Sequence, residues 1–239
     1  MFTKTMNGTY ENIDCMELMA RYPDKHFDLA IVDPPYGINF PYNKYIDSEE
    51  NLINIIIGKH LPEIRRICKR VLVFCNHAKI YLFPKCDWII SYSWNTTGSY
   101  GKLGICQWQP ILFYGEDVKG FGSVNGVLKS DSIHISGGDG VGFRRTEKIN
   151  HPCPKPLNIM RDLFLRFSNE DDLIFDPYFG SGTNGVICES INRKLTASEY
   201  DELYFKEAIQ RIQTHLSQGK LFQRVGRDEI RLEQPSMFA

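Results

Sequence analysis

The sequence offers little support for a metal centre, a disulfide framework or a membrane anchor. Its seven cysteines form no Cys-x-x-Cys pair and lie near no histidine cluster, which argues against zinc and against structural disulfides. No hydrophobic run approaches the length of a membrane span, and residues 1–10 lack the apolar core of a signal peptide. We therefore expect a cytoplasmic protein with reduced thiols, no metal and no membrane partner.

The chain also lacks an excess of charge of either sign. Its formal net charge is −1 over 239 residues, so any face that binds nucleic acid must be a local basic patch. The hydrophobic share of 42% is enough to bury a full core, either as one large domain or as one domain with an insertion.

One apolar run, residues 27–32, stops at an aspartate, two prolines and a tyrosine. The run predicts a buried strand, and Pro34 and Pro35 prevent both its continuation and an immediate helix. Asp33 to Tyr36 must form a stiff loop at the C-terminal end of the strand, where open parallel sheets bind ligands. This loop presents the groups needed to hold a planar base with an exocyclic amine. An ordinary turn with solvent-facing Asp33 and Tyr36 is the alternative.

A second apolar run, 172–175, precedes a loop with two glycines and a helical pattern that continues to about Arg193. A strand, a glycine-rich turn and a helix bring backbone and free N–H groups close to a ligand. The loop has neither P-loop nor Gly-x-Gly-x-x-Gly spacing. Glu199, at the end of the next expected strand, is placed to accept hydrogen bonds from ribose hydroxyls. The loop residues are Asp176, Pro177, Tyr178, Phe179, Gly180, Ser181, Gly182 and Thr183.

Together, these two loops resemble the catalytic and cofactor motifs of S-adenosylmethionine-dependent DNA amino-methyltransferases. The catalytic motif comes first in this chain, an order similar to that of the circularly permuted beta group of the family. Asp14-Cys15 and the stretch 151–156, which reads His-Pro-Cys-Pro-Lys-Pro, match the family as well. The resemblance extends from about Tyr10 to Gln213.

The resemblance implies one methyltransferase domain over residues 1–239. Its fold would be α/β and Rossmann-like, with a single open, mostly parallel sheet flanked by helices, circularly permuted and carrying a small recognition insertion. Asp14 reads from the sequence as a helix N-cap, and the resemblance adds a contact to the cofactor's adenine. The cofactor is S-adenosyl-L-methionine, and the residues implied to bind it are Asp14, Cys15, Lys155, Asp176, Tyr178, Phe179, Gly180, Ser181, Gly182, Thr183 and Glu199.

Residues 115–150 are the stretch left free for target recognition between the two motifs. Periodicity fades there, glycine is frequent, and basic residues outnumber acidic ones after Asp117. We expect Arg144, Arg145 and Lys148 to contact DNA phosphates, with Lys44 in the loop after Tyr36 as a further candidate. A surface Ω-like loop is the alternative for this stretch.

The remaining pattern predicts alternating strands and helices. Between 49 and 70, Gly58 and Pro62 interrupt the helical pattern, so we expect two helices. A pair of strands, 88–94 and 110–114, should close one edge of the sheet as a hairpin. The other expected elements are a helix from Asp14 to Arg21, a strand over 71–76, an amphipathic helix from Pro156 to about Phe167 and a final helix over 201–217.

The chemistry implied is methylation of adenine N6 in double-stranded DNA. The exocyclic nitrogen is a poor nucleophile until acceptors such as Asp33 and the Pro34 or Pro35 carbonyl draw its protons. The base should be flipped out, with the Tyr36 ring stacked on it. N4-cytosine methylation, which uses the same chemistry, is the alternative. In the resembling family a Ser-Pro-Pro-Tyr loop often accompanies cytosine, so Asp33 in place of serine favours adenine. A DNA-binding subunit that has lost methylation activity is another alternative. Because the recognition region is short, a homodimer or a separate specificity subunit is plausible. A role in restriction-modification is also expected.

Overall fold

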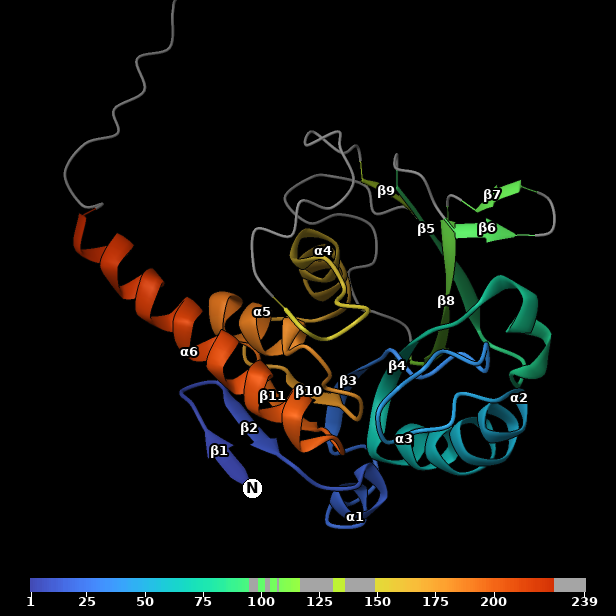
Figure 1. Ribbon diagram of the computed structural model, residues 1–239. Helices are drawn as coiled ribbons and strands as arrows, with labels where there is room; N and C mark the ends of the chain where they lie inside the picture. Colours follow the sequence, from blue (N-terminus) through green and yellow to red (C-terminus); the bar gives the residue numbers. More distant parts are fainter. Residues whose placement is uncertain (95–98, 102–103, 107, 117–130, 136–148, 226–239) are drawn as a thin grey trace, which may run out of the picture.

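The computed structural model describes residues 1–94, 99–101, 104–106, 108–116, 131–135 and 149–225 (Figure 1). In this part of the chain, one nine-stranded sheet has the order β1-β2-β11-β10-β3-β4-β8-β5-β9. β6 (Ser99–Gly101) and β7 (Gly104–Cys106) form a separate antiparallel pair. The sheet strands are β1 (Phe2–Lys4), β2 (Gly8–Glu11), β3 (Phe27–Val32), β4 (Cys68–Phe74), β5 (Trp88–Trp94), β8 (Trp108–Gly115), β9 (Ser132–Ile135), β10 (Leu173–Asp176) and β11 (Lys194–Ser198).

The middle of the sheet is parallel. β2, β11, β10, β3 and β4 run in one direction, whereas β1, β8 and β5 introduce antiparallel pairings. β10 and β3 are neighbours, with Ile174 opposite Leu29 and Phe175 opposite Ala30. The strands before the two sequence motifs therefore end side by side, and the expected α/β fold with a mostly parallel sheet is confirmed.

Helices cover both faces of the sheet, and β3 contributes to two cores. Leu29 and Ile31 pack in one hydrophobic cluster, and Ala30 and Val32 in the other. This explains why β3 is apolar from Leu29 to Val32, since a strand buried on both faces has no polar side. Figure 1 shows α4, α5 and α6 on one side and α1 to α3 on the other. The helices of 49–67 are described below. The other helices are α1 (Cys15–Met19), the 3-10 helix η2 (His77–Leu82), α4 (Leu157–Phe167), α5 (Thr183–Ile191) and α6 (Glu202–Val225).

Two details differ from the sequence predictions. The strands β5 and β8 do pair, but β9 lies outside β5, so the pair does not form the edge. β9 has only four residues, too few for a periodic signal. The stretch 49–67 is one continuous helical run of α2 (Glu49–Asn51), the π-helix η1 (Leu52–His60) and α3 (Leu61–Ile67). Gly58 lies inside η1, and Pro62, near the start of α3, removes one N–H donor from the run without ending it.

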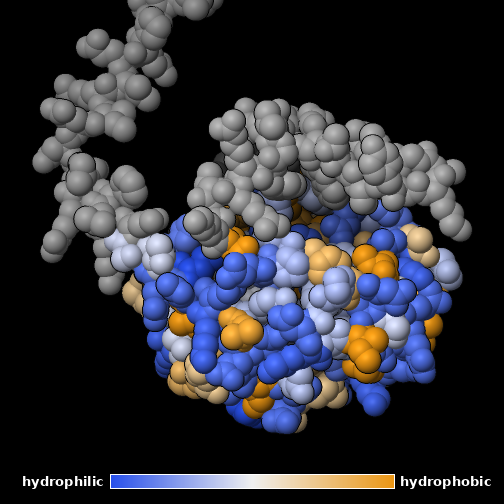
Figure 2. Space-filling model, in the orientation of Figure 1, coloured by the Kyte–Doolittle hydropathy of each residue, from blue (hydrophilic) through white to orange (hydrophobic). Residues whose placement is uncertain are grey.

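The surface in view is mostly hydrophilic, with apolar residues in small separate patches (Figure 2). Among the described residues, no helix combines the length and the apolar character needed to cross a membrane.

Candidate active site

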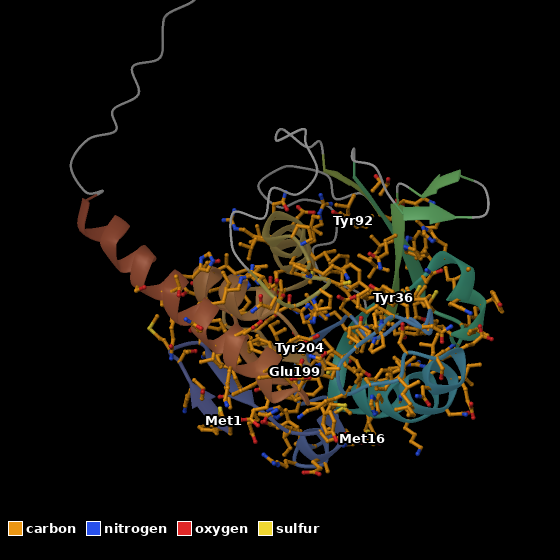
Figure 3. The ribbon with its side chains drawn as sticks, viewed as in Figure 1. Met1, Met16, Tyr36, Tyr92, Glu199 and Tyr204 are labelled. Atoms are coloured by element: carbon orange, nitrogen blue, oxygen red, sulfur yellow. The ribbon has the colours of Figure 1, made fainter. Side chains whose placement is uncertain are left out.

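The two motif loops open into one cavity of about 410 Å3 at the carboxyl edge of the sheet. This volume lies in the range of small-molecule sites. Tyr36 lies in the loop after β3, and Glu199 directly follows β11. Both residues line the cavity and are labelled in Figure 3. The predicted residues that line the cavity are Asp14, Cys15, Asp33, Pro34, Pro35, Tyr36, Lys44, Lys155, Asp176, Tyr178, Phe179, Gly180, Ser181, Thr183 and Glu199.

Asp33 is the centre of a hydrogen-bond network. Its Oδ1 accepts a hydrogen bond from the Tyr36 hydroxyl, and its Oδ2 lies 2.6 Å from Lys155 Nζ. The Tyr36 oxygen also accepts from Lys155 Nζ at 3.0 Å and from Gln109 Nε2 at 2.6 Å. Burial, and then the neighbouring Asp33 carboxylate, raises the pKa of Tyr36 well above its usual value, so its hydroxyl stays a donor.

Asp176 is buried at the start of the second motif loop. Its Oδ1 accepts from Tyr178 N at 2.9 Å and its Oδ2 from Asn184 Nδ2 at 2.8 Å. Burial raises the pKa of Asp176 to about 7 despite these two donors. The side chain therefore ties the loop to the first turn of α5.

Glu199 and Asp14 both combine a local structural contact with a place on the cavity wall. The Glu199 carboxylate accepts from Gly180 N and from Asp201 N, each at 2.8 Å, and burial raises its pKa. Asp14 caps α1 by accepting from Met16 N at 2.7 Å. A carboxylate has about four acceptor positions, so each keeps capacity for a ligand hydroxyl or amine.

The two loop glycines serve different contacts. Both have left-handed backbone, with φ of +52° at Gly180 and +74° at Gly182. Gly180 lines the cavity. A side chain at Gly182 would instead meet α6, because its Cβ would lie 2.9 Å from that of Ala208. The structure thus gives a packing reason for a glycine at 182, and the expected close approach of the cofactor to Gly182 stays a prediction.

Tyr178 and Phe179 point to different surroundings. The Tyr178 hydroxyl lies 2.7 Å from His60 Nδ1, which is also 3.5 Å from Cys15 Sγ. Burial lowers the pKa of His60 and raises that of Cys15 to about 12, so both are neutral. Phe179 stacks on Tyr10 in the core, with 4.9 Å between ring centroids. No sequence signal linked His60, which comes from η1, to either motif.

The loop that follows Tyr36 is organised by Asp47, a buried residue that the sequence analysis missed. Its carboxylate accepts from Gly37 N at 2.6 Å, from Ile38 N at 3.2 Å and from Phe40 N at 3.0 Å. These bonds fix the fold of the loop, and Ile38, Phe40 and Asp47 line the cavity.

Of the predicted DNA-binding residues, the structure places only Lys44. It lines the cavity, and its Nζ lies 6.0 Å from the centroid of the Tyr200 ring. Arg144, Arg145 and Lys148 lie outside the described residues. Within the described ranges, no three His, Cys, Asp or Glu side chains gather as a metal-binding group.

The fold is similar to that of DNA methyltransferases of known structure. The crystal structure of PvuII DNA methyltransferase, which is cytosine-N4-specific, matches with a TM-score of 0.65 at 13% identity over 90% of this chain and 93% of its own. The crystal structure of the M1.HpyAVI-SAM complex matches with a TM-score of 0.59 at 19% identity over 85% and 99% of the two chains.

Sequence comparisons define the family. A family model described as DNA methylase, of the N6/N4 type, matches residues 122–210. DNA adenine methyltransferase YhdJ of Escherichia coli K12 is 22% identical and covers 83% of this chain and 80% of its own length. Type II methyltransferase M.HpaI of Haemophilus parainfluenzae is 24% identical, with 85% and 74% covered. Residues 122–210 thus match the N6/N4 DNA methylase family, and the two relatives that cover most of the chain are named DNA methyltransferases.

Proposed function

We propose that the protein transfers a methyl group from S-adenosyl-L-methionine to N6 of a flipped adenine in double-stranded DNA. The observation that carries this proposal is the Asp33 carboxylate on a stiff loop that shares one cavity with the glycine-containing loop. A similar protein, YhdJ, is named a DNA adenine methyltransferase, which supports adenine. The PvuII enzyme has a similar fold and is cytosine-N4-specific, so the choice of adenine rests on Asp33 in place of serine.

The cavity residues suit S-adenosyl-L-methionine. Glu199 can accept hydrogen bonds from ribose hydroxyls, and Asp14 can accept from an adenine amine. Tyr45 lines the cavity, and its hydroxyl is buried without a hydrogen-bond partner among the described residues. A polar ligand atom would satisfy this hydroxyl, whereas an unpaired one is costly. The carboxylates at the cavity also favour a ligand with a positive sulfonium.

In the proposed reaction, the protein's main task is to activate the amine and align it. The cofactor, when bound, supplies an activated methyl group. Asp33 accepts a hydrogen bond from the adenine amine, and the carbonyl of Pro34 or Pro35 accepts a second, which directs the nitrogen lone pair away from the ring. The Tyr36 ring stacks on the flipped base and fixes its plane.

Target recognition is assigned, as part of this proposal, to residues 115–150. Phosphate contacts are assigned to Arg144, Arg145, Lys148 and Lys44, because phosphate binding needs basic side chains. A homodimer or a separate specificity subunit would extend the short recognition region, and sedimentation of the pure protein with and without DNA distinguishes these arrangements.

The proposal predicts N6-methyladenine in one short sequence motif. DNA from a methylation-deficient host that expresses the protein is sequenced by a method that reports modified bases. Expression of the Asp33→Ala variant is the matched control and should leave the motif unmethylated. N4-methylcytosine in place of N6-methyladenine would overturn the assignment of the base, and unmodified DNA from active expression would overturn the function.

Cofactor binding should depend on Glu199. S-adenosyl-L-methionine should raise the melting temperature by mass action. Glu199→Ala should weaken binding by about 1.5–3 kcal/mol for each charge-assisted hydrogen bond lost. Calorimetry of wild type, Glu199→Ala and the control Glu202→Ala measures this. Glu202 is an exposed carboxylate paired with Lys206, so its removal should leave the affinity unchanged. Equal affinities for all three proteins would exclude Glu199 from the cofactor site.

A further inference from the structure

Lys155 connects the two motif loops through two different groups. Its ammonium lies 2.6 Å from Asp33 Oδ2 in the first loop. Its backbone carbonyl accepts a hydrogen bond from Thr183 Oγ1, at the end of the second loop, at 3.1 Å. Arg211 on α6 holds the same threonine oxygen, with its Nη1 at 2.8 Å. The distance between Asp33 and the second loop therefore depends on one residue that both loops hold.

The ammonium of Lys155 is confined by its surroundings. The side chains of Lys155 and Asp33 are 17% and 26% exposed. Nζ lies 5.0 Å from the centroid of the Phe74 ring and 5.5 Å from that of Tyr36, distances at which aromatic rings attract a cation. A flexible lysine held by a carboxylate and two rings has few other positions. Removing its charge would leave a largely buried carboxylate unpaired, which is costly.

Lys155 also fixes the hydroxyl of Tyr36. That oxygen accepts from Lys155 Nζ at 3.0 Å and from Gln109 Nε2, on β8, at 2.6 Å, while it donates to Asp33. One ammonium thus bonds to the carboxylate that would accept from the amine and to the ring that would stack on the base. The Lys155 contacts hold both parts of the catalytic loop in one arrangement.

We propose that Lys155 is a positioning residue, which sets the place of the Asp33 carboxylate relative to the cofactor loop. This inference rests on the proposed function and differs from the cofactor contact that the family resemblance implies for Lys155. A displacement of about 1 Å at a reacting group is enough to lower a rate about 100-fold. The effect of Lys155 should therefore appear in the rate of the saturated enzyme and not in the affinity for the cofactor.

The variant Lys155→Met keeps a long apolar stem but removes the charge. We expect its single-turnover methylation rate, with both substrates saturating, to fall about 10- to 100-fold. The dissociation constant of S-adenosyl-L-methionine, measured by calorimetry, should stay within about threefold of wild type. Lys155→Arg keeps the charge and should recover part of the rate, because its guanidinium is larger and donates in a different geometry.

Lys194→Met is the matched control. Lys194 pairs with Asp171 at 3.3 Å, and the two side chains are 54% and 74% exposed. Lys194 is the first residue of β11, so it lies at the amino end of the strand, away from the cavity at the carboxyl ends. This variant should keep the wild-type rate. If Lys155→Met does not fold by circular dichroism, Lys155→Arg carries the test, with a reduced rate and unchanged cofactor affinity expected.

The outcomes separate this inference from the proposed function. A wild-type protein that methylates no DNA overturns the function itself. A methylating wild type whose Lys155→Met variant has an unchanged saturated rate overturns the positioning role. A Lys155→Met variant with cofactor affinity at least tenfold weaker and an unchanged saturated rate makes Lys155 a cofactor ligand, and the positioning role is then wrong.

Discussion

Asp33→Ala is expected to lower the single-turnover methylation rate by about two to four orders of magnitude, as for loss of a positioned acceptor or base. The hydrogen bond from the adenine amine to Asp33 strengthens as the nitrogen becomes tetrahedral and cationic, so its contribution lies mainly in the transition state. Cofactor affinity should therefore change little. The measurement is a rapid-quench assay on the motif found by sequencing, with cofactor binding followed separately by calorimetry.

Asp33→Asn is the matched control for shape. It keeps an acceptor oxygen for the Tyr36 hydroxyl but loses the negative charge that attracts Lys155 and the cationic amine. Its rate should fall between those of wild type and alanine. An alanine variant that methylates at the wild-type rate under saturating conditions would contradict the assignment of this loop as the catalytic centre.

The loss of Lys155's partner must be separated from the loss of chemistry. Asp33→Ala leaves the ammonium of Lys155, whose side chain is 17% exposed, without its carboxylate, which destabilises the fold. The double variant Asp33→Ala/Lys155→Met removes both charges and should recover part of the stability. Its methylation rate should not recover, because the acceptor is still missing.

Local sequence patterns were sufficient to predict the strands that position the site. The run before Asp33 predicted β3, and the run before the glycine-containing loop predicted β10, because each is mostly apolar and ends at a turn. A parallel arrangement then placed both loops at one edge. These are short-range features, which the order of residues determines directly.

The contacts within the site depend on long-range packing that no local pattern contains. Gln109 reaches Tyr36 only because β8 pairs antiparallel with β4, next to β3. His60 contacts Tyr178 from a π-helix that the sequence did not predict. The glycine-containing loop was visible in the sequence, but the pattern could not show that α6 packs against Gly182.

The contribution of Asp176 to the stability of the protein should fall as the pH rises from about 4 to about 7. Burial raises the pKa of Asp176 to about 7 in the folded protein, whereas an unfolded aspartate titrates near pH 4, as is usual. Between these values the folded state holds a proton that the unfolded state has released, so stability decreases with increasing pH and levels off above about 7. At about 1.4 kcal/mol per pKa unit, the full effect is roughly 4 kcal/mol.

Asn184 offers a partner for the proton. Within the described part of the chain, its Oδ1 is buried without a hydrogen-bond partner, while its Nδ2 donates to Asp176 Oδ2. The two atoms of an amide are interchangeable by a flip. A flipped Asn184 amide would accept a hydrogen bond from protonated Asp176, and Tyr178 N would still donate to Oδ1.

Asp176→Asn should therefore remove this part of the pH dependence and be more stable than wild type at pH 8. The amide of the new asparagine can donate to the oxygen of a flipped Asn184 and still accept from Tyr178 N. Both hydrogen bonds of the wild-type carboxylate are therefore replaced by bonds of an uncharged side chain. Urea unfolding of wild type and variant at several pH values from 4 to 8 gives the difference in free energy of unfolding. Asp171→Asn, at an exposed aspartate before β10, is the control and should follow the wild-type curve. An Asp176→Asn curve with the wild-type slope would show that Asp176 is ionised throughout this range, and its two N–H donors would then outweigh its burial.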